Sequence, residues 1–317
     1  MQQLQRRLGL TASMGIGVAA MLGAGVFYVW SPAFELAGSW LMVSLLIAGV
    51  VATLNGLVTA QLAMQLPVSG GIYAYAGHYR GPYMGFLAGW LFVTGKTASA
   101  AAIAYIAASY LAPDFAREVA VGFVVIFTAV IVSGIRIAAG VSIAISLAVI
   151  VGVVWFVAPR QLSASWPSVD TDPSIMGIAT AAGLFFFAFA GYARMATLGE
   201  EARNPTRTIP RAIVGALWIV FVIYLMVGLA ITPALQTAAV IPDAPLTLLS
   251  SAGSAWVMVA LAVVASLGSL MAILAGLSRT TLAMAARATF PRCSRGCRRA
   301  RRDPSLPKSP SPLPQLL

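Results

Sequence analysis

The sequence predicts an all-α, polytopic membrane protein, and three observations lead to this fold class. Of its 317 residues, 60% are hydrophobic and only 9% are charged, whereas about a quarter of the residues in a soluble domain are charged. The mean hydropathy is +0.89. The apolar residues also gather in segments of about twenty residues, which is the length of a helix that crosses a bilayer.

Eight apolar segments of this kind follow one another along the chain, which predicts about eight transmembrane helices. They are Leu10–Ser31, Ser39–Met64, Tyr83–Leu111, Val119–Ile135, Ala138–Ala158, Met176–Leu198, Ala212–Ala234 and Ser251–Leu277. A stretch with Pro and Gly, 67–71, follows the second segment, and we expect His78 and Arg80 in a loop before the third. A polar connector, 159–173, separates the fifth segment from the sixth.

Basic residues orient the chain, because cytoplasmic loops are enriched in Lys and Arg. If the N-terminus is inside, nine arginines of the first 287 residues fall on the cytoplasmic side and two, Arg117 and Arg160, fall outside. The sequence thus predicts an integral protein of the cell (inner) membrane with both termini in the cytoplasm. The net charge of +11 comes from these short loops and a basic tail, so we expect the lipid bilayer, and no nucleic acid, as a partner.

The first segment carries glycines at a depth where a helix is rarely interrupted. Within Met14 to Tyr28, Gly23 and Gly25 favour a local break of the helix. A break inside a bilayer frees backbone groups that only protein or a water-filled cavity can satisfy. The stretch is therefore a candidate binding site.

A second interruption falls in the sixth segment, where Gly191 and the charged Arg194 follow a run of phenylalanines. Paired interruptions at corresponding places of two halves are typical of transporters built from inverted repeats, with the substrate at the midplane. The first and sixth segments correspond if each repeat has five helices. Tight helix packing is the alternative explanation of these glycines.

Four motifs then resemble the amino acid–polyamine–organocation (APC) superfamily of permeases, in that family's order. They are Gly23 to Phe27, Leu66 to Tyr75 with Gly81 to Trp90, Glu200 to Pro210, and Ser278 to Met284. The resemblance covers about residues 8–287. It implies a five-plus-five inverted-repeat fold, with a first repeat over about 10–158 and a second over about 176–277 that is incomplete, in a transmembrane region 1–287.

The resemblance also implies a substrate site in the two interruptions. The backbone N–H groups of Gly23, Ala24 and Gly25 would meet the carboxylate of an amino acid, at the positive end of a half-helix.

The other half of the implied site lies in the sixth segment. The carbonyls of Phe187, Ala188 and Phe189 would receive the α-ammonium group. Phe187, Phe189 and Tyr192 could line the side-chain pocket, although an aromatic stripe is more often plain packing.

Two basic residues depart from the family pattern. Arg194 follows the position, here Ala193, at which family members often have an acid, so it could favour a neutral or acidic substrate or extend to the cytoplasmic interface. Lys96 lies near the middle of the third segment, and a charge within the membrane indicates a function by default. It could carry a coupling proton, or it could form a structural pair.

Residues 288–317 differ in composition from the rest of the chain, with seven of its 20 basic residues, six prolines and both cysteines. Such a basic, Pro-rich tail is expected to be disordered. A GC-rich gene that is read out of frame also encodes a segment of this composition. Family members usually continue with more helices. We therefore expect a frameshift near Arg287, which the DNA sequence would test.

The sequence thus predicts a secondary active transporter of an amino acid or related amine that works by alternating access. Its driving force would be a proton, another cation or exchange. The alternative is a transport-incompetent fragment that serves at most as a membrane interaction protein. An enzyme is not expected, because no nucleophile–base pair, phosphate loop or metal cluster is found in the sequence, and no cofactor is predicted.

Overall fold

The computed structural model describes residues 9–66, 70–133, 139–161, 174–196, 202–242, 244–251 and 253–286. Every element in these ranges is a helix. The elements are α1 (Leu10–Met21), α2 (Ala24–Tyr28), α3 (Trp30–Ala37), η1 (Gly38–Trp40), α4 (Leu41–Gln65), α5 (Ile72–Arg80), α6 (Pro82–Leu111), η2 (Pro113–Phe115), α7 (Ala116–Val132), α8 (Ala139–Gln161), α9 (Ile175–Phe189), η3 (Ala190–Tyr192), α10 (Ala193–Ala196), α11 (Pro205–Thr237), η4 (Pro245–Leu249) and α12 (Ala255–Ala286).

The predicted fold class is confirmed: the chain is a polytopic all-α membrane protein. Within the described ranges, seven helical stretches are long and apolar enough to cross a bilayer, and the apolar helix Ala144–Arg160 is shorter. Each of the eight predicted segments overlaps one of these eight helical stretches, although the observed bounds often differ from the predicted ones. Large apolar side chains such as Val50, Leu54 and Trp155 are exposed on the outer surface, as expected of a surface that faces lipid.

One connector was predicted wrongly as a loop. Residues 72–80 form the helix α5, so His78 and Arg80 lie in its last turn. Glycines at positive φ angles delimit this helix, Gly71 at 53° and Gly81 at 88°. Since only glycine adopts such angles readily, the two residues start and end a helix that hydropathy does not detect.

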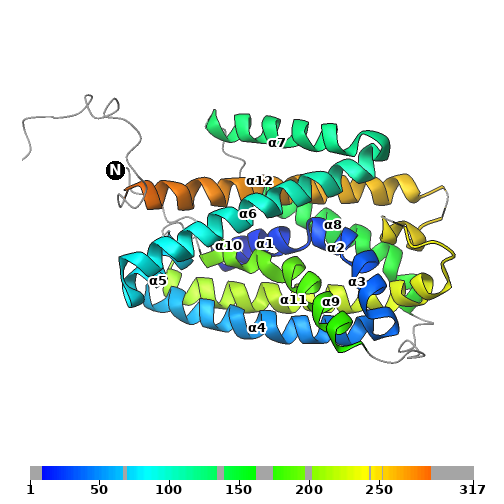
Figure 1. Ribbon diagram of the computed structural model, residues 1–317, viewed down its shortest axis with the longest axis horizontal. Coiled ribbons are helices and arrows are strands. Elements are labelled where there is room, and N and C mark those ends of the chain that lie inside the picture. Colours follow the sequence, from blue (N-terminus) through cyan, green and yellow to red (C-terminus); the bar gives the residue numbers. More distant parts are fainter. Residues whose placement is uncertain are drawn as a thin grey trace, which may run out of the picture.

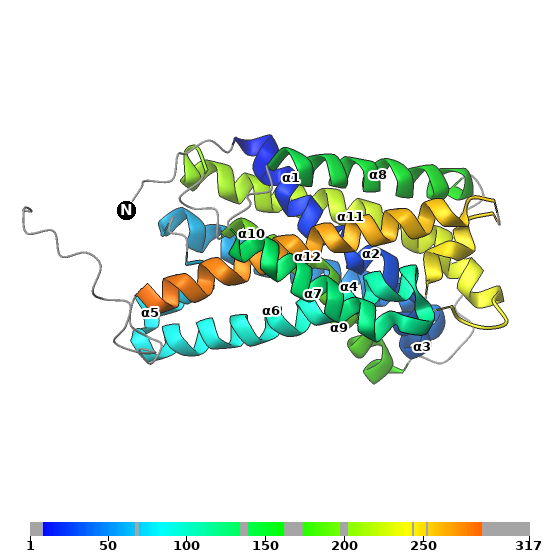
Figure 2. The ribbon, with the colours of Figure 1, turned by 90° about the horizontal axis from the view of Figure 1, so that it is seen from above.

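The long helices lie roughly along one axis, and the short helices α1, α2 and α10 lie among them (Figure 1). The long helices α4 and α11 pack against each other, and α12 packs against α6. Figure 2, a view from above, shows α12 crossing the molecule between α6 and α8.

The interrupted first and sixth segments pack against each other in opposite directions. The first half-helix, α1, contacts η3 and α10 at the end of the sixth segment, whereas α2 contacts α9 at its start. This antiparallel pairing is what an inverted repeat predicts for its two interrupted helices.

Some sequence-based expectations lie outside the described residues. These are most of the polar connector 159–173, the first residues of the motif Glu200 to Pro210, the frameshift near Arg287 and the tail 288–317.

Candidate functional site

The first segment breaks where its glycines predicted a break. The helix α1 ends at Met21, Leu22 and Gly23 form a bend, and α2 begins at Ala24. Gly23 has a ψ angle of −130°, which is far from helical, and as a glycine it has no side chain with which to cap α2. The direction of the chain therefore changes at the centre of the molecule.

The sixth segment is interrupted more mildly than the first. Between α9 and α10 the helix tightens into the 3₁₀ turn η3, in which the N–H of Ala190 donates to the carbonyl of Phe187. A 3₁₀ stretch within a longer helix often marks a hinge or a strained sequence. The interruption is thus a tightened turn, and its backbone is less open than that of Gly23.

Glycines bring the two interruptions into close contact. A methyl group on Gly191 would lie 2.5 Å from the backbone of Ala20, and one on Gly25 would lie 2.7 Å from the Cβ atom of Ala188. These two glycines therefore permit close packing, as the alternative explanation proposed, while Gly23 forms the break itself.

Hydroxyl groups from neighbouring helices satisfy backbone carbonyls of the broken first segment. The hydroxyl of Tyr224 on α11 donates to the carbonyl of Met21 at 2.8 Å and lies 3.5 Å from that of Ala188. Ser269 on α12 donates to Ala19 at 3.1 Å. Such internal partners are what a break within a bilayer requires.

A third hydroxyl group donates a hydrogen bond to the second half-helix, α2. Tyr110, near the end of α6, donates to the carbonyl of Phe27 at 2.6 Å and packs edge-on against its ring. Sequence analysis did not identify Tyr110, Tyr224 or Ser269. Each of them is a hydroxyl-bearing residue within an apolar helix, a feature that many residues in this chain share.

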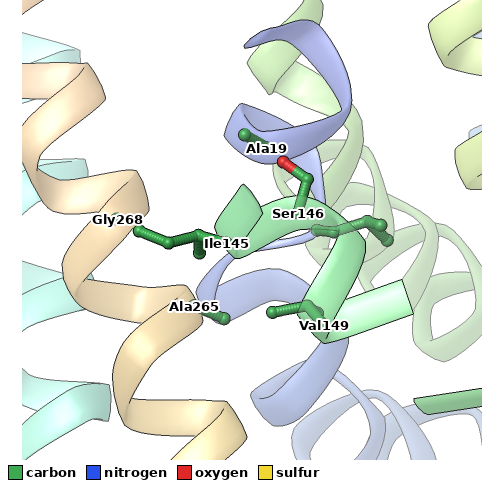
Figure 3. A pocket seen from close by; sticks show the side chains of 7 residues that line it. Ala19, Ile145, Ser146, Val149, Ala265 and Gly268 are labelled. Atoms are coloured by element: carbon green, nitrogen blue, oxygen red, sulfur yellow. The ribbon is translucent and has the colours of Figure 1, made fainter. Parts of the chain in front are cut away.

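A gap about the size of a water molecule lies beside α1, between α8 and α12. Figure 3 shows Ser146 pointing from α8 toward α1, with Ile145 and Val149 on the same helix. The Ser146 hydroxyl donates to the carbonyl of Gly15 at 3.4 Å. This gap is narrow and mostly apolar, so it lacks the polar groups that an amino acid needs.

The predicted aromatic residues are only partly brought together. Phe189 is buried and packs edge-on against Tyr224, with ring centroids 5.0 Å apart. Tyr192 is also buried, but Phe187 is 39% exposed on the surface. Phe189 therefore contacts Tyr224, one of the partners of the first break.

The two basic residues singled out in the sequence line one pocket next to both interruptions. Lys96 and Arg194 share it with Ala20, at the end of α1, and with Gly191. Lys96 is half-buried, and its Nζ atom lies 6.0 Å from the ring centroid of Phe92. Two residues from distant segments thus contribute positive charge to one place.

Comparison with known families explains this architecture. The sequence model of the family described as amino acid permease matches residues 13–303. The chain belongs to the amino acid permease family. The resemblance to APC permeases is thereby confirmed, and this permease is an integral membrane transporter of amino acids. The match continues past Arg287, and the expected frameshift stays a prediction that the nucleotides of the gene test.

Several curated proteins resemble the permease over most of its length. Uncharacterized transporters of Mycobacterium tuberculosis and Mycobacterium bovis are 45% identical over 305 residues, which cover 92% of this chain and 68% of theirs. The chloroplastic cationic amino acid transporter 6 of Arabidopsis thaliana is 27% identical over 86% of this chain. The permease spans 53% of that plant protein.

Proposed function

We propose that the permease moves an amino acid or related amine across the cytoplasmic membrane by alternating access, as a secondary active transporter. The observation that carries the proposal is the antiparallel contact of two interrupted segments at the centre of the fold. Interrupted helices of this kind hold substrates and ions in transporters built from inverted repeats.

The substrate would bind between the two interruptions. The N–H groups of Gly23, Ala24 and Gly25 would hold its carboxylate, because the first N–H groups of a helix such as α2 have no acceptor within that helix and lie at its positive dipole end. The carbonyls at 187–189 would accept hydrogen bonds from its ammonium group, since a carbonyl oxygen has a second lone pair after its first bond.

The space between the two interruptions is closed in this structure, so a substrate site there would have to open. The side chain of Ser269 lies against Gly23, and the hydroxyl of Tyr224 and the methyl group of Ala188 lie against Gly25. Substrate entry would therefore require α11 or α12 to move relative to the broken first segment. Such movement of helices around a fixed site is the basis of alternating access.

Uptake into proteoliposomes tests the proposal. We expect the purified chain to accumulate one or more radiolabelled amino acids saturably and only when an ion or substrate gradient is imposed. In the matched pair of variants, Gly25→Ala should abolish uptake because its methyl group would lie 2.7 Å from the Cβ atom of Ala188, while Gly183→Ala should not, because an added methyl there meets nothing within 4 Å. Accumulation no greater than in empty liposomes would contradict the function, and uptake that never saturates would indicate a channel.

A proton carried by Lys96 is the coupling step that we propose. Lys96 lines the pocket beside both interruptions, so its protonation can influence their packing. Lys96→Ala should abolish proton-driven uptake but leave exchange of internal for external substrate intact. If proton-driven uptake persists in Lys96→Ala, Lys96 does not carry the coupling proton and its role is structural.

A further inference from the structure

Two exposed arginines lie in the first turns of the long helix α11. Arg207 and Arg211 are four residues apart, so their side chains lie on the same face of the helix. Both are exposed, whereas the neighbouring Ile209, Ala212 and Ile213 are buried. Positive charge is therefore concentrated on the outward face at the start of α11.

The same face continues as an apolar strip toward the middle of α11. The strip consists of Val214, Trp218 and Val222, which are all exposed, with Trp218 at 66%. At 3.6 residues per turn, these three side chains and the two arginines fall within about 80° of the helix circumference. A lipid molecule lying along α11 would thus meet positive charge first and apolar side chains next.

The length of α11 places the two arginines at the edge of a bilayer. Its 33 residues span about 50 Å at 1.5 Å per residue, whereas the hydrocarbon core of a bilayer is about 30 Å thick. Because guanidinium groups are costly to bury in hydrocarbon, we expect the arginine end of the helix to extend into the headgroup layer. Trp218 lies about 10 Å further along the helix than Arg211, and tryptophan is enriched at the membrane interface.

We propose that the outward face of α11 binds an anionic phospholipid, with the headgroup phosphate between Arg207 and Arg211 and one acyl chain along the apolar strip. A guanidinium group can bind phosphate oxygens through two parallel hydrogen bonds. The apolar strip favours a lipid over a free phosphate ion, because only a lipid has an acyl chain to contact it. This inference does not depend on the proposed transport function.

The net charge of the headgroup should determine how strongly the lipid binds. Phosphatidylglycerol carries a net negative charge, whereas phosphatidylcholine has the same phosphate and a cationic choline group that compensates it. Each basic side chain near an anionic membrane surface strengthens binding by about fivefold, so two arginines predict a preference of about 25-fold for phosphatidylglycerol. The predicted orientation puts this end of α11 at the cytoplasmic leaflet, whose surface is negatively charged.

Lipid titration of the purified full chain in detergent tests the proposal. The melting temperature is measured as dioleoylphosphatidylglycerol or dioleoylphosphatidylcholine is added, and the concentration that gives half of the stabilisation is compared. We expect phosphatidylglycerol to act at a concentration about 25-fold lower. Arg207→Gln/Arg211→Gln should remove this preference. The matched control Arg80→Gln/Arg117→Gln removes two exposed arginines from the end of α5 and the start of α7, and should retain the preference.

A second measurement locates the acyl chain. Brominated acyl chains quench the fluorescence of tryptophans that they contact. At concentrations of brominated phosphatidylglycerol that occupy only the tight site, Trp218→Phe should lose most of the quenching. The control Trp155→Phe, which removes an exposed tryptophan of α8, should lose little of it.

Several outcomes would overturn the inference. Equal affinities of the two lipids for the unmodified chain would do so, as would a preference that persists in Arg207→Gln/Arg211→Gln. An equal loss of preference in the control double variant would show that the preference follows the net charge of the chain alone. If soluble glycerol 1-phosphate stabilises the chain through these arginines at the same concentrations, the site binds free phosphate groups and the inference fails. Quenching that is unchanged in Trp218→Phe would contradict the position of the acyl chain.

Discussion

Tyr224 shows how a single residue stabilises a helix break within a membrane protein. It is fully buried on α11, and its hydroxyl donates to the carbonyl of Met21, the last residue of α1. The ring also packs edge-on against Trp30 and Phe189. One side chain thus satisfies the end of the first half-helix and contacts the sixth segment.

Tyr224→Phe should therefore destabilise the fold while preserving its packing. The substitution leaves the carbonyl of Met21 buried without this donor, and we expect a loss of about 1–3 kcal/mol. Thermal unfolding in detergent measures the effect. The matched control is Tyr105→Phe on α6, whose ring is 51% exposed and which should change little. Equal melting temperatures for Tyr224→Phe and the unmodified chain would show that the hydroxyl contributes nothing.

The packing at Gly23 leads to a second prediction at this scale. An alanine at this position would collide with the Oγ and Cβ atoms of Ser269. Gly23→Ala should cost about 1–3 kcal/mol as an overpacked substitution. The double variant Gly23→Ala/Ser269→Gly should recover part of this loss, since the colliding side chain is removed. A double-mutant cycle of melting temperatures measures the coupling, and strictly additive effects would contradict direct contact.

At the scale of single residues, the sequence predicted the break of the first segment at its glycines. Gly23 and its neighbour Gly25 stand out because glycine in a transmembrane helix permits either a break or close packing. Tyr224 and Ser269 could not be singled out, because their role depends on a carbonyl about 200 residues or more away in the sequence. The site roles of the residues at 187–189 stay predictions.

At the scale of helices, hydropathy predicted the long elements and missed the short amphipathic ones. Each predicted apolar segment overlaps an observed helix, because burial of backbone groups in lipid requires helices. The helix α5 is less apolar and depends on Gly71 and Gly81 at its ends. The 3₁₀ turn at 190–192 packs against α1, and although Gly191 predicted an interruption here, the local sequence does not predict that this interruption is only a tightened turn.

Contact between α5 and the end of the sixth segment leads to a prediction for alkaline solution. The hydroxyl of Tyr75 on α5, outside the membrane-spanning helices, donates to the carbonyl of Ala196 at 3.4 Å. Burial raises the pKa of Tyr75 to about 12, from the ordinary value of 10.0. Because the folded state holds this proton more tightly, its contribution to stability is complete below pH 10 and is lost as the pH rises toward 12.

Tyr75→Phe should accordingly remove part of the alkaline loss of stability. At neutral pH we expect a decrease of about 0.5–1.5 kcal/mol, because a single long hydrogen bond is lost. Between pH 10 and 12 the melting temperature of the variant should fall less steeply than that of the unmodified chain. Parallel curves for the two proteins would mean that Tyr75 does not hold its proton in this way.

At the scale of the whole molecule, the arrangement of segments could be expected only through the family resemblance. Hydropathy predicts the order of the helices along the chain but not which helices pack against each other. The pairing of the first segment with the sixth joins residues about 170 positions apart, as at Ala20 and Gly191. The resemblance implied this pairing through an inverted repeat, and the antiparallel contact in the structure supports it.

Membrane orientation is the prediction that concerns the whole chain, since the excess of basic residues in alternate loops predicts that both termini lie in the cytoplasm. The only cysteines, Cys293 and Cys297, lie in the tail, so no other cysteine competes for a thiol label. A membrane-impermeant maleimide should therefore label the chain only after the cells are permeabilised. In the reverse control Cys293→Ser/Cys297→Ser/Ser251→Cys, the new thiol follows the seventh segment at an exposed position and should be labelled in intact cells. Labelling of the tail in intact cells would contradict the predicted orientation, because the tail would then lie outside the cell.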